Sequence, residues 1–422
     1  MSLSLARKVI GSEFSLINGA WLCVISALAL SVLGLYAIDL GVPERVGDAD
    51  GPIALTGIVA RQAVFIAVGL LAAAMVALPH YRFVRWVAWP LMVLVIGLLI
   101  FLLLPFVPAS IVTPRNGARA WINFGPIDFQ PAELAKIAYV LVVADYLRLR
   151  QNHRTLLGLL PPALITFVPI ALIMLQPDLG TAMLFAPAIF AMLVGAGAKL
   201  KHLMAVVLVA TLAAPAVFPL LKTHQKDRII GLFKMMKDPQ QGADDINYQS
   251  VTAQRLAGAG GVWGISENKS RALIRFNRLP ERHNDMILAI ILNRFGLFGG
   301  LGLIVLYIVW FTGCYLTAAM SRDGFGRLII IGLASIMAAQ TFVNIGMTLG
   351  ILPIIGVTLP FVSYGGSSML TGWTITGLIM GVALRRNQRF ARQTFEFDDQ
   401  PYDPARVSTA HRAAPALSPR SR

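Results

Sequence analysis

Residues 83–106 read FVRWVAWPLMVLVIGLLIFLLLPF, and this stretch decides the fold class. It carries a single charged residue, Arg85, in an otherwise apolar run. A helix of this length crosses a hydrocarbon layer of about 30 Å. The stretch therefore predicts a membrane-spanning helix.

Runs of the same kind recur on both sides of this one. Of the 422 residues, 56% are hydrophobic and only 14% are charged, which leaves too little polar surface for a soluble domain. The run that begins at residue 285 is overlong, so we expect it to tilt or to begin outside the hydrocarbon core. We predict an all-α integral membrane protein with about ten transmembrane helices. These cover 16–38, 54–79, 83–106, 131–149, 156–175, 180–198, 202–221, 285–316, 328–352 and 367–384.

The net charge of +15 follows membrane topology rather than a nucleic-acid surface. Arginine and lysine gather in alternate short connections, and the intervening connections are acidic or neutral. This positive-inside pattern places both termini in the cytoplasm, in a multi-pass protein of the cytoplasmic (inner) membrane, and we expect no nucleic-acid partner. The basic positions are Arg7, Lys8, Arg82, Arg85, Arg148, Arg150, Arg154, Lys199, Lys201, Arg322, Arg327, Arg385, Arg386, Arg389 and Arg392.

The chain divides into a short cytoplasmic arm, a membrane domain and a basic tail. The arm covers residues 1–15, the membrane domain 16–384, and the tail 385–422, whose composition is that of a disordered cytoplasmic segment. A polar stretch at 222–284 interrupts the membrane domain on its outer side. Its first part, 227–237, alternates apolar and basic residues as a helix on lipid headgroups does, and a loop this long is more often functional than idle. A solvated connector is the alternative.

Ionisable residues near membrane depth are costly unless they are paired or hydrated. Glu133 and Lys136 stand three positions apart at the start of a helix, so they share one face and can pair. The alternative is an ion pair that only orients the helix. Asp178 sits in the turn Gln176-Pro-Asp-Leu-Gly-Thr, whose proline and glycine free backbone groups to face a cavity. A simple turn is the alternative there.

Asp285 begins the eighth apolar run at the outer interface, after Pro280-Glu-Arg-His-Asn. A carboxylate held there, partly desolvated and near His283, is well placed to accept a proton. Aspartate is also a preferred residue for capping the amino terminus of a helix. A cap is therefore the alternative, and the two roles can coexist.

The last outer connection reads Ile351-Leu-Pro-Ile-Ile-Gly-Val-Thr-Leu-Pro-Phe-Val-Ser-Tyr-Gly-Gly-Ser-Ser. It has no charge, two prolines and three glycines, so we expect a re-entrant loop whose exposed amides hold an anionic head group. Ser367 or Ser368 would cap the tenth helix. Gln340 and Asn344, four positions apart in the ninth helix, would lie below the loop on one face. Hydrogen bonding between helices is the alternative for that pair.

These residues together resemble the SEDS family, the shape, elongation, division and sporulation glycosyltransferases that polymerise peptidoglycan. The resemblance extends over most of the membrane domain and rests on many strings in one order. The amino-acid sequence of the final loop is more similar to that of RodA, the elongation member, than to that of FtsW, the division member. The long basic tail is atypical for RodA. The matching strings are Arg61-Gln62, Gly117-Ala-Arg-Ala-Trp-Ile, Gln130-Pro-Ala-Glu-Leu-Ala-Lys, Gln176-Pro-Asp-Leu-Gly-Thr, Tyr248-Gln, the glycine-rich turn at Gly258, Leu279-Pro-Glu-Arg-His-Asn-Asp, Asn344-Ile-Gly-Met and Pro360-Phe-Val-Ser-Tyr-Gly-Gly-Ser-Ser.

The resemblance implies a reaction on lipid II in the outer leaflet. The 4-hydroxyl of one disaccharide attacks the anomeric carbon of another, and undecaprenyl pyrophosphate leaves with inversion. Such a reaction needs a base for the hydroxyl and cations for the pyrophosphate. Asp285 matches the family's essential aspartate, which implies the role of base. The implied substrate contacts are Arg119, Lys136 and Arg228 for the pyrophosphate, Glu133 and Asp178 for the shape of the cavity, and Asn344, Ser363, Tyr364, Gly365, Gly366 and Ser367 for binding.

A divalent cation, Mg²⁺ or Mn²⁺, would supplement these side chains, since such ions bridge phosphates and carboxylates. No organic cofactor is expected, and the sequence shows no dedicated metal cage. The resemblance also implies a class B penicillin-binding protein as partner, together with other proteins of the elongation complex. A division-specific polymerase, a lipid II flippase and a structural scaffold are the alternative functions.

The chain departs from the family where a Glu-Glu pair usually follows the aspartate, because Asn293-Arg294 occupies that position. The exchange removes two negative charges and adds a positive one, which puts metal ligation on this helix in doubt. Arg271, Arg275 and Arg278 also make the preceding loop unusually basic. Contact with pyrophosphate or a partner protein is one hypothesis for these arginines, and solvation of the loop is the other.

Overall fold

The computed structural model describes residues 18–42, 57–112, 114, 118–125, 128–150, 152–220, 226, 230–231, 248–321 and 323–385. The predicted cytoplasmic arm, nearly all of the basic tail and most of the headgroup helix predicted at 227–237 lie outside these residues. The boundaries assigned to the two ends of the chain therefore stay predictions.

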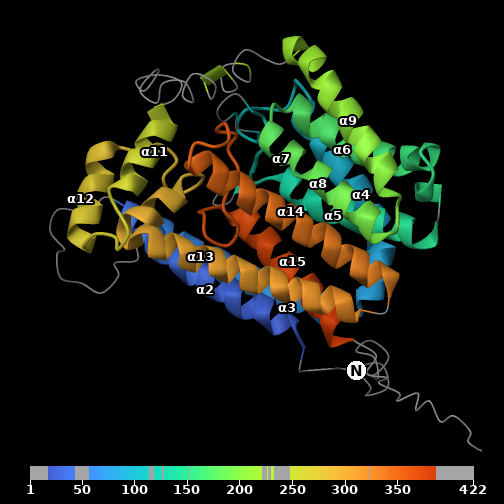
Figure 1. Cartoon of the computed structure of the whole chain (residues 1–422), viewed down its shortest axis with the longest axis horizontal. Coiled ribbons are helices and arrows are strands. Elements are labelled where there is room, and N and C mark those ends of the chain that lie inside the picture. The colour runs from blue at the N-terminus through green and yellow to red at the C-terminus, as the bar shows by residue number, and fades with distance from the viewer. Residues whose placement is uncertain are drawn as a thin grey trace, which may run out of the picture. The chain divides into compact units, whose positions relative to one another are not determined.

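The described part of the chain is a helical bundle, and each of the ten predicted runs corresponds to helix (Figure 1). The run predicted at 180–198 is divided into two helices. In chain order the helices are α2 (Ala20–Gly41), α3 (Gly57–Ala77), α4 (Tyr81–Leu103), α5 (Pro131–Leu149), α6 (Leu160–Leu175), α7 (Leu179–Met183), α8 (Phe185–Gly195), α9 (Leu200–Val217), α11 (Tyr248–Gly258), α12 (Glu267–Asn277), α13 (Ile287–Met320), α14 (Gly324–Thr348) and α15 (Gly366–Leu384).

Seven of these helices are long and apolar enough to cross a membrane: α2, α3, α4, α6, α13, α14 and α15. The apolar stretches of α7–α8 and α9 are shorter. Short 3₁₀ turns η1 (Asn152–Arg154), η2 (Leu157–Leu159) and η3 (Phe218–Leu220) accompany α6 and α9. The chain is therefore a multi-pass membrane protein.

Helix α5 lies at the centre of the bundle although it carries four charged residues. It contacts α4, α6, α8, α14 and α15. Every residue from Ile137 to Ala144 is buried, and the alanines of this stretch let neighbouring helices approach closely. The first turns of α5 therefore hold their ionisable side chains inside the protein.

Close helix pairs build the rest of the bundle. Helix α3 runs along α15, and α2 runs along α13 (Figure 1). Gly377 of α15 faces the backbone of Ala73 in α3 so closely that a Cβ at this position would collide with the Ala73 carbonyl oxygen. Gly69 of α3 receives the ring of Trp373 from α15 in the same way. Small residues thus allow the two backbones to meet without an unfilled gap.

The overlong run predicted from residue 285 is two helical segments that meet at Gly296, which has φ +65° and ψ −159° within α13. The turn after α11 packs into this break. Leu297 N donates to Gly261 O at 3.0 Å, and Phe298 N donates to Val262 O at 3.3 Å. The first segment of α13 therefore forms a lobe with α11 and α12, at the end of the bundle (Figure 1).

The connection between α4 and α5 forms a second, smaller lobe. Strands β1 (Ile122–Asn123) and β2 (Asp128–Phe129) pair antiparallel within it. The lobe has its own apolar core, made by Leu102, Val107, Val112 and Ile122. This core places β2 and the residues after it directly before α5.

Candidate functional site

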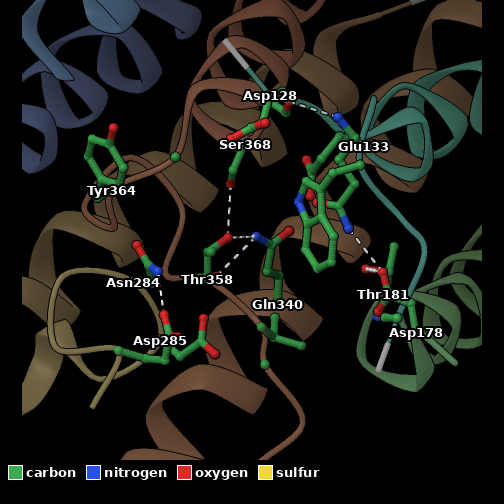
Figure 2. Close-up of a pocket in the computed structure, with 18 of the residues that line it drawn as sticks. Asp128, Glu133, Asp178, Thr181, Asn284, Asp285, Gln340, Thr358, Tyr364 and Ser368 are labelled. Atoms are coloured by element: carbon green, nitrogen blue, oxygen red, sulfur yellow. Dashed lines mark hydrogen bonds between the residues drawn. The ribbon is translucent and has the colours of Figure 1, made fainter. Parts of the chain in front are cut away.

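A cavity of about 770 Å³ lies where α3, β2, α5, α7, α14, α15 and the two irregular segments 279–286 and 351–365 meet (Figure 2). Its lining is rich in oxygen atoms. Among the described residues it includes five carboxylates and one guanidinium. The polar and charged side chains are Arg61, Asp128, Gln130, Glu133, Asp178, Thr181, Glu281, Asn284, Asp285, Gln340, Thr358, Tyr364, Ser367 and Ser368.

The cavity brings together seven of the site residues predicted from the sequence, although they come from four separate parts of the chain. These are Glu133, Asp178, Asp285, Tyr364, Gly365, Gly366 and Ser367. Four others, Arg119, Lys136, Asn344 and Ser363, are described by the structure but do not line the cavity. Arg228 lies outside the described residues.

Asp285 stands in the irregular segment just before α13 and is partly buried. The amino-terminal cap position of α13 is Met286, with no capping bond from its side chain, so Asp285 stands one residue before that position. Asn344 of α14 donates from Nδ2 to the Asp285 carbonyl oxygen at 2.8 Å. Gly356 lies beside the carboxylate, and its φ of +74° is a conformation that favours glycine.

His283 is near Asp285 in the chain but does not line the cavity. Its imidazole ring packs on Gly41 at the end of α2. Burial, with a smaller contribution from the Arg282 charge, lowers the pKa of His283 to about 4. The ring is therefore neutral at pH 7, and its backbone oxygen accepts a bond from Tyr364 N at 2.8 Å.

The predicted pair of Glu133 and Lys136 forms in the first turns of α5. Lys136 Nζ lies 2.8 Å from Glu133 Oε1, and the two side chains are only 1% and 8% exposed. Gln340 Oε1 of α14 accepts a second bond from Lys136 Nζ at 3.0 Å. Glu133 faces the cavity and Lys136 lies behind it, so the ammonium offsets the charge of a cavity carboxylate.

Asp178 caps α7 and also fastens the small lobe to it. Its oxygens accept bonds from Thr181 N at 3.0 Å, from Thr181 Oγ1 at 2.9 Å and from Gln130 Nε2 at 2.9 Å. Burial raises the pKa of the Asp178 carboxyl, and the two bonds from Thr181 act in the opposite direction. Three hydrogen bonds therefore stabilise the Asp178 carboxylate although it is buried.

The segment 351–365 is irregular, as expected for a re-entrant loop. Buried amides hold it from two helices. Gln62 of α3 donates to Ser363 O at 3.0 Å and accepts from Gly365 N at 3.2 Å. Asn344 donates to Val357 O at 2.6 Å. Tyr307 of α13 completes the set with a bond from its hydroxyl to Pro360 O at 2.6 Å.

Ser367 and Ser368 do not cap α15, which corrects the prediction. The cap is Gly365, with no capping bond from a side chain. Ser367 Oγ instead accepts from Gln130 N and donates to Asp128 O, both at 3.0 Å. Ser368 Oγ lies 3.0 Å from Thr358 Oγ1. The two hydroxyls therefore join α15 to the small lobe and to the re-entrant loop.

Several cavity residues were not named as site residues from the sequence. Arg61 is the one cationic side chain of the lining among the described residues, and its string Arg61-Gln62 was noted only as part of the resemblance. Arg119, which was expected at the pyrophosphate, instead donates from Nη2 to Val107 O at 3.1 Å in the small lobe. A single sequence does not mark neutral residues such as Gln130 and Thr358 as part of a site, because hydrogen-bonding side chains of this kind are common in any fold.

The lining offers only partial support for a divalent cation. Its donors are carboxylate, amide and hydroxyl oxygens, which Mg²⁺ and Mn²⁺ prefer. The described residues contain no group of three or more His, Cys, Asp or Glu side chains placed to hold a metal. A cation here would thus take one or two carboxylates as ligands and complete its shell from a bound phosphate and water.

Asn293 and Arg294, the departure from the family, lie away from the cavity. Asn293 is fully buried, accepts from Ser270 Oγ at 2.7 Å and donates to Leu256 O at 2.8 Å. Arg294 donates to Tyr36 Oη at 3.1 Å. These side chains join α13 to α11, α12 and α2, so in this chain the two positions attach the lobe and do not line the cavity.

The fold and sequence match proteins of one family. A sequence profile of the FtsW/RodA/SpoVE family, described as cell cycle protein, matches residues 20–388. The peptidoglycan glycosyltransferase MrdB of Escherichia coli (strain K12) is 35% identical over 273 residues, which cover 64% of this chain and 72% of that protein. The stage V sporulation protein E of Bacillus subtilis (strain 168) is 31% identical over 327 residues, which cover 76% of this chain and 86% of that protein.

Solved structures agree. One belongs to a study of how a peptidoglycan synthase complex coordinates polymerization and crosslinking; it matches with a TM-score of 0.70 at 30% identity and covers 87% of this chain and 98% of that one. The rod shape determining protein RodA of Thermus thermophilus matches with a TM-score of 0.61 at 27% identity, over 87% and 97% of the two chains. This chain belongs to the FtsW/RodA/SpoVE family.

Proposed function

We propose that this protein is a peptidoglycan glycosyltransferase that polymerises lipid II at the outer face of the cytoplasmic membrane. The observation that carries the proposal is the position of Asp285 in a cavity lined by polar groups from distant parts of the chain. The names of relatives such as MrdB of Escherichia coli, a peptidoglycan glycosyltransferase, support the same reaction.

In the proposed reaction the Asp285 carboxylate takes the proton of the acceptor's 4-hydroxyl. That oxygen then forms a bond to the anomeric carbon of the donor, the bond from this carbon to the pyrophosphate breaks, and the configuration inverts. A positioned base of this kind contributes on the order of 10² to 10⁴ in rate. Arg61 is the cationic lining residue available to the departing pyrophosphate. A divalent cation, if bound, supplies further positive charge there.

We assign the polymerase to cell elongation and cell shape, and we expect a class B penicillin-binding protein and other elongation proteins as its partners. The amino-acid sequence of the final loop, which is more similar to RodA than to FtsW, supports the assignment. Identity alone does not separate the two branches, since the chain is 32% identical to a probable FtsW of Bacillus subtilis and 35% identical to MrdB. The likeness to a peptidoglycan synthase complex supports a crosslinking partner.

The test is polymerisation of labelled lipid II by the purified protein with its penicillin-binding partner, whose own activities are disabled. Asp285→Asn should lose at least 100-fold in rate, because the amide is not a base. Asp145→Asn is the matched control, since Asp145 is a carboxylate outside the cavity that pairs with Arg148 at 3.0 Å. Glycan ladders of equal yield from wild type and Asp285→Asn would remove the base assignment. No product from wild type would favour the flippase or scaffold functions.

A further inference from the structure

Gln340 lines the cavity, and its amide points towards Thr358 of the re-entrant loop (Figure 2). Gln340 is 2% exposed. Its Oε1 accepts from Lys136 Nζ at 3.0 Å. Its Nε2 donates to Thr358 O at 3.0 Å and lies 3.2 Å from Thr358 Oγ1. One side chain of α14 therefore contacts both α5 and the re-entrant loop.

The two ends of this amide are not interchangeable. The Thr358 carbonyl can only accept a hydrogen bond, and the Lys136 ammonium can only donate. Nε2 must therefore face the loop and Oε1 must face Lys136. A residue that only accepts, or only donates, cannot replace the amide at this position.

The groups on the two sides of Gln340 reach the cavity separately. On one side Lys136 bonds to Glu133, which lines the cavity. On the other side Thr358 Oγ1 lies 3.0 Å from Ser368 Oγ, and both residues line the cavity. Gln340 therefore links the Glu133 side of the cavity to this pair of hydroxyls, in addition to the bond between Ser367 and Gln130 N.

We propose that Gln340 is a positioning residue, which holds the Glu133 carboxylate and the Thr358–Ser368 hydroxyl pair in fixed relation across the cavity. The inference rests on the proposed function and adds a residue whose role is to hold other lining groups in place. Displacement of reacting groups by about 1 Å costs on the order of 100-fold in rate, so an intact link between the two sides matters for turnover.

The decisive variant is Gln340→Glu, which preserves size and the acceptor that faces Lys136 but places a second acceptor against Thr358 O. Measured with labelled lipid II, kcat should fall about tenfold or more while KM changes less than about threefold, because the loss concerns the geometry of the reacting groups. The activity of the variant relative to wild type should recover as the pH falls from 8 to 5.5. A protonated carboxyl again has a donor and an acceptor. The one ammonium beside it, Lys136, favours the ionised form but already pairs with Glu133, so a second buried carboxylate leaves one negative charge unbalanced, and this favours its protonation.

Thr358→Val tests the other side of the link, since it removes the hydroxyl and retains the carbonyl. It should lower kcat less than Gln340→Glu, and the combined variant should lose less than the product of the two effects. Thr376→Val is the matched control, because the Thr376 hydroxyl donates to Gly372 O within α15 at 3.0 Å. It should keep the rate of wild type.

Wild-type kcat in Gln340→Glu, or a loss that is the same at every pH, would overturn the inference and leave the proposed function intact. If that variant does not accumulate, Thr358→Val decides, and an unchanged kcat there is the contrary result. Absence of product from wild-type protein would overturn the proposed function and this inference with it.

Discussion

The re-entrant loop 351–365 and the lobe of α11 and α12 are held to the bundle by different chemistry. The loop has no charged residue. Its bonds to the bundle come from neutral side chains, chiefly Gln62, Gln340 and Asn344, which are all buried. The lobe has neutral bonds to α13 as well, but charged side chains join it to α2. Arg271 of α12 pairs with Asp39 of α2 at 2.5 Å and with Glu267 at 2.9 Å.

The same network continues into the two neighbouring helices. Glu267 Oε2 accepts from Tyr36 Oη of α2 at 2.9 Å, and Tyr36 Oη accepts from Arg294 of α13 at 3.1 Å. Glu267 is 41% exposed at its side chain. Charged side chains thus attach the lobe where water reaches the network, whereas buried amides hold the re-entrant loop, because an unpaired charge at that depth costs far more than an amide.

The largest effect should come from Lys136→Met, which leaves the buried Glu133 carboxylate without its ammonium. Breaking a buried pair costs about 3–5 kcal/mol of folding free energy. We expect a clear fall in thermal stability in detergent and loss of polymerisation. The double variant with Glu133→Gln should recover much of the stability but not the rate. A single variant as stable as wild type would show that the cavity region does not depend on this charge balance.

Asn344→Leu should have the next largest effect, because it leaves the carbonyl oxygens of Asp285 and Val357 without their bonds at 2.8 and 2.6 Å. Each buried group left unpaired costs about 1–3 kcal/mol. We expect lower thermal stability together with weaker polymerisation. Ser335→Ala is the control, since Ser335 Oγ donates to Ile331 O within α14 at 2.7 Å. Equal behaviour of the two variants would mean that the amide does not hold the loop.

His283, in the segment that connects the lobe to the cavity, should make stability depend on pH. Its pKa is about 4 in the folded protein and 6.5 in the unfolded chain, so between these values the unfolded state binds more protons. Stability should therefore fall as the pH drops from 6.5 towards 4, by at most about 1.4 kcal/mol per pH unit. In His283→Phe this part of the dependence should disappear. A wild-type stability that is flat across this range would contradict it.

The smallest effect should come from the lobe. Bonds from Arg271 and then Tyr36 lower the pKa of Glu267, so the carboxylate contributes stability above its unfolded pKa and loses it as the pH falls through the folded value. We expect the amides of α12 to be less protected near pH 3.5 than at pH 7, after the exchange rates are corrected for the intrinsic dependence of amide exchange on pH, and less protected in high salt as well. Glu267→Gln should remove the difference and retain polymerisation. If polymerisation instead fell as far as in Asn344→Leu, the two regions would not differ as described.

Local patterns in the sequence were sufficient for the helices and for part of the site. Ten apolar runs predicted ten helical regions, because length and hydropathy are properties of each segment. The spacing of Glu133 and Lys136 predicted their pair for the same reason. The uncharged, proline- and glycine-rich segment 351–365 predicted an irregular loop. Asp178 and Asp285, which the turn at Pro177 and the resemblance had singled out, both line the cavity.

Contacts between distant segments had no such signal, and only the tertiary structure decided them. Gln62 reaches Ser363, which is 301 residues away, and Ser367 bonds to the segment at Gln130 instead of capping its own helix. Lys136 lies behind Glu133, and the cationic side chain in the described lining is Arg61, whereas the resemblance had implied Arg119 and Lys136. The sequence alone determined which segments enter the membrane, since hydropathy is local. Which side chains share the cavity depended on how those segments pack, since each bond there joins elements far apart in the chain.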